Sequence, residues 1–389
     1  TAMAGFDKGI GFDMGGTSTD VSHYAGTFER SFETQVAGVR LRSPIMHVHT
    51  VAAGGGSLLQ FDGARFRVGP ESAGADPGPA CYGRGGPLTV TDANVFLGRV
   101  QPAHFPHVFG ENGEAYLDSQ AAAQRFRALA KEVNSVLGIV ISAEAVAEGF
   151  LKVAVENMAN AIKKISVQRG YDVTEYTLAC FGGAGGQHAC QVADTLGMTT
   201  VHIHPFAGVL SAYGMGLAEI TAHRERTIEQ ELTAELETPL EDIADALANE
   251  IRAELAGQGM AVDRVRLRHN AHLRYAGTDT ALEVPLGPAQ EMARAFQTAH
   301  GARFGFTDPG RDLIVESLTV EGTGVTEKTS EASIAQSTQA PKPIDTVPLH
   351  LDGTTGTAPV FNRDTLGHGD TIMGPAILAE RTGTTIVEP

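Results

Sequence analysis

GFDMGGTSTDV, residues 11–21, is the stretch of sequence that decides the fold of this chain. Its glycine pair, Gly15 and Gly16, lies between two short runs of residues that favour β-strands. Glycine and small polar residues between two such runs are typical of a turn. The sequence therefore predicts a β-hairpin over residues 9–24, with its tip at residues 14–18.

The hairpin tip also has the composition of a phosphate-binding loop. Glycine leaves backbone N–H groups accessible, and hydroxyl side chains can join them in binding anionic oxygens. The residues that we predict to bind phosphate are Gly15, Gly16, Thr17, Ser18 and Thr19. Asp13 and Asp20 would repel a phosphate unless a cation lay between them, so the motif also predicts Mg²⁺ held through water molecules. A tight hairpin with polar turn residues is the alternative, and the pattern is not that of a Walker A loop.

A second glycine-rich segment, FGGAGGQHA at residues 181–189, joins the end of a predicted strand to the start of a predicted helix. Glycines at such a junction let the adenosine or phosphates of a nucleotide approach the backbone, and the helix dipole favours an anion. A Rossmann fingerprint fits this segment only loosely. A purely structural glycine turn explains the segment equally well when it is taken alone.

Composition narrows the classes of function. The chain has 389 residues and 42% hydrophobic content, enough for about two or three globular domains. A net charge of -17 would repel nucleic acid and anionic lipid, so we expect no nucleic-acid or membrane partner. The 3 cysteines lack C-x-x-C spacing, which favours a reducing compartment, and we expect a cytoplasmic protein. The first residues resemble no signal peptide and contain no initiator Met, so we expect a segment of a longer protein.

The pattern of elements changes near residue 222. Before it we predict strands over 177–181 and 199–203, and helices capped by Ser119, capped by Ser142 over 143–168, and over 208–220. After it we predict a helix from Thr238 to about Leu255, a half-buried strand over 264–275, short strands over 357–389 and a linker over 329–343. The sequence thus predicts an α/β domain over residues 1–222 and a smaller, strand-rich α+β domain over residues 223–389.

Several other polar clusters have structural interpretations that we favour over functional ones. They are the pairs His47 with His49 and His202 with His204, the thiols Cys180 and Cys190 beside His188, and the arginine face from Arg264 to Arg274. Glu71, Asp76 and Asp92 lie in the most glycine-rich region. For these three carboxylates, binding of a water molecule of Mg²⁺ or action as a general base is as well supported as the capping of turns.

Longer motifs give the chain a resemblance to a known family. They are HTVAAGGGS (49–57), GPESAGADPGPACYGRGGPLTVTDANVFLGR (69–99), AGVLSAYGMGLAE (207–219), RYAGTDTALEVP (274–285) and GPAILAERTGTTIVEP (374–389). Together with the two glycine-rich segments they strongly resemble the hydantoinase A/5-oxoprolinase family. The resemblance extends over nearly the whole chain.

The resemblance implies a lobe of the actin-like, sugar-kinase-type ATPase superfamily, with a mixed sheet and flanking helices. Mapped onto this chain, residues 13–20 would be the second phosphate loop, 182–186 the adenosine loop and 208–220 a connecting helix. The ATP-binding residues so implied in the adenosine loop are Gly182, Gly183 and Gly185. The family's first phosphate loop, a similar D-x-G-G-T-x-T-D, does not occur in this chain.

The function implied by the resemblance is ATP-dependent opening of a cyclic amide, of the 5-oxoprolinase or hydantoinase type. Asp13 and Asp20 would orient Mg²⁺, and an N-terminal lobe, a hydantoinase B-type domain or subunit, and further copies in an oligomer would be partners. Two alternatives stay open: an ATP-binding subunit of an acetone carboxylase-like enzyme, and a non-catalytic assembly domain. Without its upstream lobe, the segment by itself is expected to be inactive.

Overall fold

The computed structural model describes residues 1–36, 39–325, 336–337 and 340–389, and the chain divides into two compact units. One unit comprises Thr1–Tyr213 together with Ser333–Pro389, and the other comprises Gly214–Ala332. Both combine helices with sheets, so the predicted mixed α/β class is confirmed. None of the helices in the described part of the chain is long and apolar enough to cross a membrane.

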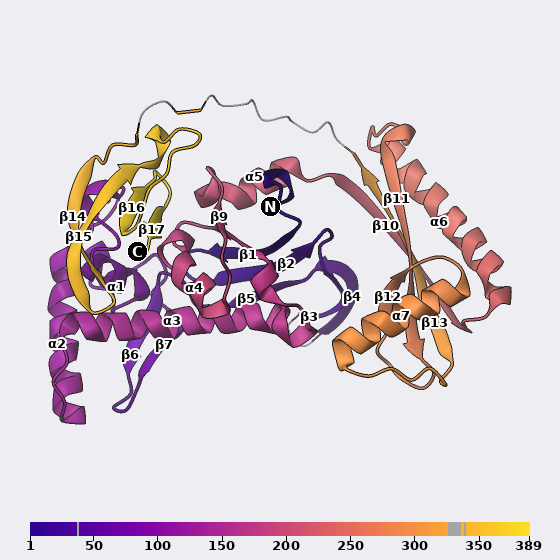
Figure 1. The fold of residues 1–389 in the computed structure, drawn as a ribbon, viewed down its shortest axis with the longest axis horizontal. Helices are drawn as coiled ribbons and strands as arrows, with labels where there is room; N and C mark the ends of the chain where they lie inside the picture. Colours follow the sequence, from indigo (N-terminus) through magenta and orange to yellow (C-terminus); the bar gives the residue numbers. More distant parts are fainter. Residues whose placement is uncertain (37–38, 326–335, 338–339) are drawn as a thin grey trace. The chain divides into compact units, whose positions relative to one another are not determined.

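The first unit is built on a five-stranded mixed sheet with the order β5-β2-β1-β8-β9 (Figure 1). The strands are β1 (Lys8–Met14), β2 (Thr19–Ala25), β5 (Val48–Val51), β8 (Thr177–Phe181) and β9 (Val201–Ile203). Strands β1 and β2 are antiparallel neighbours, which confirms the predicted hairpin. Strand β8 runs parallel to β1, so the ends of these two strands lie at the same edge of the sheet.

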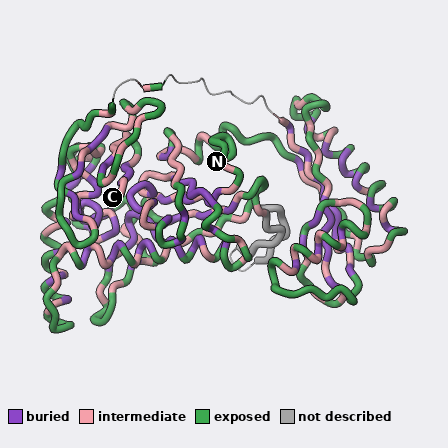
Figure 2. Tube along the Cα trace, viewed as in Figure 1, coloured by how far each residue is buried: buried purple, intermediate pink, exposed green. Residues whose placement is uncertain are grey.

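Helices pack with the sheet and supply most of the core. They are α1 (Val90–Phe96), α2 (Ser119–Leu137), α3 (Ala143–Ile165) and α4 (Ala189–Leu196). Helix α5 (Leu210–Leu217) has no buried residue. The apolar side of α3, including Phe150, Met158 and Ile162, packs with Ile10 and Phe12 of β1. Figure 2 shows the buried segments of this unit concentrated in the sheet and in α3.

The helix boundaries differ from the sequence predictions at several ends. Ser142 caps α3 as predicted, accepting the N–H of Ala145 at 3.1 Å. The cap of α2 is Asp118 and not Ser119, because the Asp118 carboxylate accepts the N–H of Ala121 at 2.9 Å. Helix α3 ends at Ile165 rather than 168, and α5 is shorter than the predicted helix over 208–220.

Three smaller sheets complete the first unit. Two are hairpins, β3 (Arg30–Val36) with β4 (Val39–Met46) and β6 (Ser57–Phe61) with β7 (Phe66–Ser72). The third consists of β14 (Asp345–Leu351), β15 (Thr354–Asn362), β16 (Ala376–Ala379) and β17 (Thr384–Val387). Its presence confirms the short strands predicted toward the end of the chain.

This division differs from the predicted one, which placed all of residues 223–389 in one C-terminal domain. The strands β14 to β17 belong to the first unit, where the His350 N–H donates to the Leu97 carbonyl at 2.8 Å and Arg99 pairs with Glu388 at 3.1 Å. Sequence order gives no sign of such contacts, because they join residues more than half the chain apart. The predicted linker over 329–343 lies largely outside the described residues.

The second unit is a four-stranded antiparallel sheet with two helices. Its order is β10-β13-β11-β12, and its elements are β10 (Ile220–Glu231), β11 (Val265–Tyr275), β12 (Leu282–Pro285), β13 (Leu313–Gly324), α6 (Glu237–Gly257) and α7 (Ala289–Phe304). Strand β11 confirms the strand predicted over 264–275. Arg274 on its polar face pairs with Glu229 at 2.6 Å and with Glu316 at 3.6 Å, as favoured from the sequence.

The start of α6 corrects the predicted Thr238 cap. The helix already begins at Glu237 and has no side-chain cap. The Glu237 carboxylate instead accepts the N–H of Ala289 at 2.7 Å, at the first residue of α7. The predicted capping sequence therefore lies within the first turn of α6, because the helix continues directly from a 3₁₀ turn at Ala234–Leu236.

Candidate functional site

The tip of the β1–β2 hairpin presents two facing carboxylates. Asp13 and Asp20 are direct cross-strand partners, so their side chains lie on the same face of the sheet. Each has one hydroxyl donor: Ser211 Oγ donates to Asp13 Oδ2 at 3.0 Å, and Thr50 Oγ1 donates to Asp20 Oδ1 at 2.5 Å. Neither donor was assigned to the motif from the sequence, since both lie well outside it along the chain.

The electrostatics of the carboxylate pair favour a cation. Partial burial raises the pKa of Asp13, the hydrogen bond from Ser211 opposes that rise, and the charge of Asp20 adds to it. A cation between the carboxylates would remove this repulsion. No group of three or more His, Cys, Asp or Glu side chains suited to a metal occurs among the residues that the structure describes. Two carboxylates without further protein ligands suit Mg²⁺, which is usually bound by one or two carboxylates plus water and phosphate.

The residues of the turn itself differ in their accessibility. Gly16 and Thr17 are exposed, and a Cβ on Gly16 would have no neighbour within 4 Å. Thr19 is the exception among the predicted phosphate ligands, because it is fully buried and its hydroxyl donates to the Ala53 carbonyl. A hydroxyl engaged in this way has no proton left for a phosphate oxygen.

A third glycine cluster, Gly54 to Gly56, holds the tip in place. The N–H of Gly55 donates to the Gly15 carbonyl at 3.1 Å, and the N–H of Gly56 donates to the Gly16 carbonyl at 2.6 Å. A Cβ on Gly54 would lie 2.6 Å from the Thr17 carbonyl carbon. The glycine run was visible in the sequence, but only the fold shows that it packs directly on the tip backbone.

These contacts predict that two glycine substitutions in the same site differ in their effect on the free energy of unfolding. We expect Gly54→Ala to lower the free energy of unfolding by about 1–3 kcal/mol, because the new methyl group must displace tip backbone. Gly16→Ala meets no atom, so we expect a change within about 0.5 kcal/mol. Urea denaturation followed by circular dichroism measures both, and equal stability of the two variants would contradict the packing described here.

The second glycine-rich segment lies against the first. Strand β8 places Phe181 beside Asp13 in register. Beyond it, the N–H of Ala184 donates to the Met14 carbonyl at 3.1 Å. Gly182 has φ +82°, and a Cβ there would overlap the Met14 carbonyl oxygen and lie 2.5 Å from Asp13 Oδ1. The two segments that the sequence singled out, far apart along the chain, are thus in direct contact.

Comparison with known proteins identifies the chain. The sequence profile of the hydantoinase/oxoprolinase family matches residues 1–224. The chain belongs to this family. It is 39% identical over 386 residues to the 5-oxoprolinase of Dictyostelium discoideum, covering 98% of this chain and 30% of that protein.

Further relatives include an enzyme of known structure. The chain is 30% identical over 404 residues to the caprolactamase subunit alpha of Pseudomonas jessenii, covering 99% of this chain and 56% of that protein. The crystal structure of the ATP-dependent caprolactamase from the same organism superposes with a TM-score of 0.84 at 28% identity, covering 99% of this chain and 57% of the other. The chain thus spans 30% to 57% of the length of these relatives.

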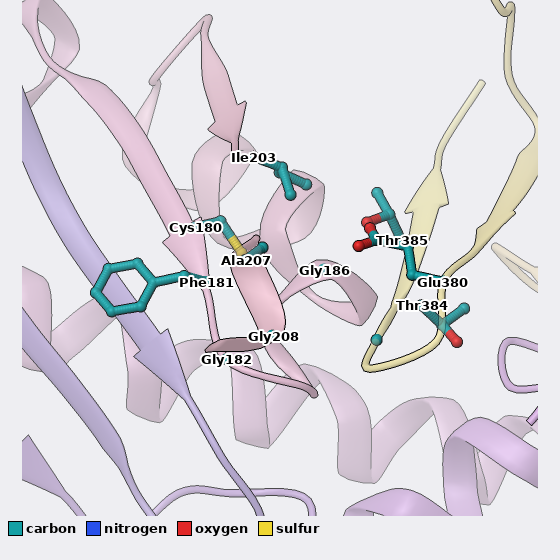
Figure 3. Close-up of a pocket in the computed structure, with 11 residues that line it drawn as sticks. Cys180, Phe181, Gly182, Gly186, Ile203, Ala207, Gly208, Glu380, Thr384 and Thr385 are labelled. Atoms are coloured by element: carbon teal, nitrogen blue, oxygen red, sulfur yellow. The ribbon is translucent and has the colours of Figure 1, made fainter. Parts of the chain in front are cut away.

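In this hydantoinase/oxoprolinase chain, the second glycine-rich segment also packs on the C-terminal strands. A Cβ on Gly183 would lie 3.1 Å from the Thr382 carbonyl oxygen, and one on Gly186 would lie 2.6 Å from Thr385 Oγ1. Figure 3 shows Glu380, Thr384 and Thr385 opposite the segment. The cavity between them measures about 10 Å³, room for a single water molecule.

The predicted adenosine loop is therefore only partly open. Gly185 is buried, and a Cβ there would lie 2.8 Å from Cys180 Sγ, so this glycine serves internal packing. Gly182 and Gly183 remain partly exposed and form the accessible rim of the loop. A nucleoside would have to meet this rim, because the side of the loop that faces the C-terminal strands is filled.

Behind the loop lies a buried polar network. Asn94 Nδ2 approaches Gln187 Oε1 at 2.9 Å and His188 Nε2 at 3.1 Å, and Arg99 Nη2 donates to the Gln187 carbonyl at 2.6 Å and to Glu388 Oε1 at 3.1 Å. Among the described residues, the buried atoms Asn94 Oδ1, Arg99 Nε and His188 Nδ1 have no hydrogen-bond partner. Burial lowers the pKa of His188 to about 3, with a smaller contribution from the charge of Arg99.

The depressed pKa of His188 predicts a specific pH dependence of stability. The unfolded chain binds a proton at this histidine near pH 6.5, whereas the folded chain does so only near pH 3. Stabilisation is therefore complete above about pH 6.5 and is lost as the pH falls toward 3. Between pH 6 and pH 4, we expect the unfolding free energy of the wild type to fall more steeply than that of His188→Gln, by about 1.4 kcal/mol per pH unit. Urea denaturation of both proteins across this pH range tests the difference, and an identical pH dependence of the two unfolding free energies would contradict it.

The other sequence candidates take mostly structural roles. Asp92 accepts the N–H groups of Ala80, Cys81 and Thr89 at 3.0, 2.7 and 2.8 Å and completes a capping box on α1, which supports turn capping. Burial raises the pKa of the Cys180 and Cys190 thiols, which disfavours the reactive thiolate. Glu71 and Asp76 are exposed, and their role stays a prediction.

Histidines outside the site also make contacts with neighbouring residues of the fold. His47 Nε2 lies 2.8 Å from Arg169 Nη2, and His204 Nδ1 accepts the N–H of Phe206 at 3.0 Å. The ring of His202 contacts that of Phe6, with centroids 5.5 Å apart. These contacts support the structural interpretation of both histidine pairs.

Proposed function

We propose that the protein containing this chain uses ATP to open a cyclic amide, of the 5-oxoproline or hydantoin class. The observation that carries the proposal is the convergence of two facing carboxylates, an exposed diglycine turn and a second glycine-rich loop at one edge of the sheet. The names of the relatives, a 5-oxoprolinase and an ATP-dependent caprolactamase, support the same reaction class.

Each part of the site has a role in this proposal. The backbone N–H of Gly16, with the side chains of Thr17 and Ser18, binds the phosphates, whereas the N–H of Gly15 donates to the Ser18 carbonyl at 3.1 Å and shapes the turn. The rim at Gly182 and Gly183 receives the adenosine. Asp13 and Asp20 would hold Mg²⁺ through water, and the ion would neutralise charge on the transferred phosphoryl group. Positioning and charge stabilisation account for most of the catalysis in such a transfer.

ATP is needed because a ring amide is a poor electrophile. Resonance lowers the reactivity of its carbon, and its nitrogen leaves as a strong base. In the proposed reaction the amide oxygen attacks the γ-phosphorus, and the bond from that phosphorus to ADP breaks. Water adds to the activated carbon, the C–N bond breaks and the nitrogen takes a proton. A second water cleaves the acyl phosphate into a carboxylate and inorganic phosphate.

Partners are part of the proposal, because the chain spans 30% of the D. discoideum relative. We propose that an upstream lobe supplies the opposite phosphate loop, and that a hydantoinase B-type domain or subunit completes ring opening. The name caprolactamase subunit alpha, given to the P. jessenii relative, supports a multi-subunit assembly.

The test uses the complete natural protein with its partner subunit. ADP release and ring opening are measured with Mg-ATP and a panel of 5-oxoproline, hydantoin, caprolactam, and acetone with bicarbonate. We expect ATP hydrolysis that depends on one of the cyclic amides, with one ring opened per ADP released. ATP turnover with acetone and bicarbonate alone, or no substrate-dependent turnover, would overturn the proposal.

A further inference from the structure

One short helix connects the separate parts of the candidate site. Helix α1 begins beside the glycine cluster that holds the tip: both the N–H and the Oγ1 of Thr91 donate to the Gly55 carbonyl, at 2.7 and 2.9 Å. One turn later, Asn94 reaches the Gln187 and His188 side chains. Immediately after the helix, Arg99 reaches the Gln187 carbonyl and Glu388.

Arg99 is the residue of this network whose burial costs the most free energy. Its side chain is 2% exposed, and it is the largest fully buried side chain among the described residues. A buried guanidinium requires a counter-ion and hydrogen-bond acceptors, because desolvation of an unpaired charge costs several kcal/mol. The same nitrogen, Nη2, meets both acceptors, the carboxylate of the C-terminal Glu388 and the backbone carbonyl at the end of the second glycine loop.

The glycine loop is positioned with few side chains of its own. Gly182 to Gly186 carry almost no side chains, so backbone hydrogen bonds and packing must set the loop. At the near end, the N–H of Gly182 donates to the Ala207 carbonyl and the N–H of Ala184 donates to the Met14 carbonyl. At the far end, Gln187 is held through its side chain by Asn94 and through its carbonyl by Arg99.

We infer that Arg99 and Glu388 are positioning residues that hold the second glycine loop in the arrangement required to bind the adenosine of ATP. The inference rests on the proposed function, because it assumes that the loop receives a nucleoside. It assigns Glu388, the residue that follows strand β17, a part in nucleotide binding. Glu388 pairs with Arg99, and Arg99 in turn donates a hydrogen bond to the Gln187 carbonyl at the end of the loop.

The test compares two ligands that share the phosphates but not the nucleoside. Mg-ATP would contact both the hairpin tip and the loop, whereas magnesium triphosphate would contact only the tip. Calorimetry on the complete natural protein gives the affinity for each. In Arg99→Met, loss of a hydrogen bond to a charged group should reduce the preference for ATP over triphosphate about ten-fold, with triphosphate affinity unchanged.

Further variants make the result specific. Arg99→Lys retains a buried cation that can donate to both acceptors, and it should recover most of the ATP preference. Glu388→Gln keeps the shape and the acceptor oxygen but removes the charge, so its effect should be smaller than that of Arg99→Met. Arg169→Met, which breaks the separate pair with Glu29 in the same unit, should leave the ATP preference as in the wild type.

The outcomes separate this inference from the proposed function. If the wild type binds neither ligand, the proposed function fails. If the wild type prefers ATP and both Arg99→Met and Glu388→Gln retain that preference in full, the inference fails while the function stands. Parallel loss of ATP and triphosphate affinity in Glu388→Gln would indicate general destabilisation and would also overturn the positioning role. If Arg99→Met does not fold, the Glu388→Gln and Arg99→Lys pair decides the question.

Discussion

Asp13→Asn is expected to reduce cyclic-amide-dependent ATP turnover by at least about 100-fold, while leaving the fold intact. The asparagine can keep the hydrogen bond with Ser211, but it cannot supply the negative charge that would hold Mg²⁺ and its waters. It also removes the repulsion between two carboxylates that face each other across the hairpin. We therefore expect stability to stay constant or to rise by up to about 1 kcal/mol.

Opposite changes in turnover and stability would indicate a functional carboxylate rather than a structural one. Steady-state ADP release on the complete protein measures the first, and urea denaturation measures the second. Asp118→Asn provides the matched control, because asparagine is as good a helix cap as aspartate and the residue caps α2 away from the hairpin. Turnover of Asp13→Asn within a factor of about two of the wild type would rule out the carboxylate assignment.

Gly182→Ala is expected to have the largest effect on stability, about 2–5 kcal/mol. The residue has φ +82°, which L side chains rarely adopt, and the new Cβ would overlap the Met14 carbonyl oxygen. The overlap cannot be relieved by moving a flexible side chain, because the opposing atom belongs to the backbone of β1. The substitution would also push the loop away from the hairpin tip, so we expect nucleotide binding to be lost with it.

Gly183→Ala is the control next along the chain. Its φ is outside the left-handed region, and its Cβ would lie 3.1 Å from the Thr382 carbonyl oxygen, a contact that a shift of a few tenths of an ångström relieves. We expect the free energy of unfolding to fall by less than about 1 kcal/mol. Urea denaturation of both variants tests the contrast. Equal costs would mean that the two segments are not packed as described.

The sequence anticipated the hairpin and the long helix α3 because both depend on local signals. Two short β-type runs around a glycine pair specify a hairpin, and apolar residues at three- and four-residue spacing specify a buried helix face. The helix caps were predicted less accurately. Helix α2 uses Asp118 where Ser119 was predicted, since two adjacent residues can both supply an oxygen. At α6, the predicted cap was wrong because the helix continues from the 3₁₀ turn Ala234–Leu236 and so begins before Thr238.

The candidate site was predicted in its parts but not in its assembly. Asp13, Asp20 and the glycines were recognisable from their spacing, whereas Ser211, Thr50 and the glycine cluster at Gly54 were not assigned to the site. Thr19 was predicted to bind phosphate, yet its hydroxyl is engaged by the Ala53 carbonyl. Hydroxyl groups look alike in a sequence, and only burial shows which of them can meet a ligand.

The sequence by itself determined the family, the hairpin tip and the glycine-rich segments, because motif spacing and glycine content are local properties of the chain. Only the tertiary structure decided that the two segments touch and that Gly183 and Gly186 make room for the C-terminal strands. It also decided that Arg99 joins that end of the chain to the loop. These contacts depend on the parallel pairing of β1 with β8 and on burial of a charge, which no local pattern records.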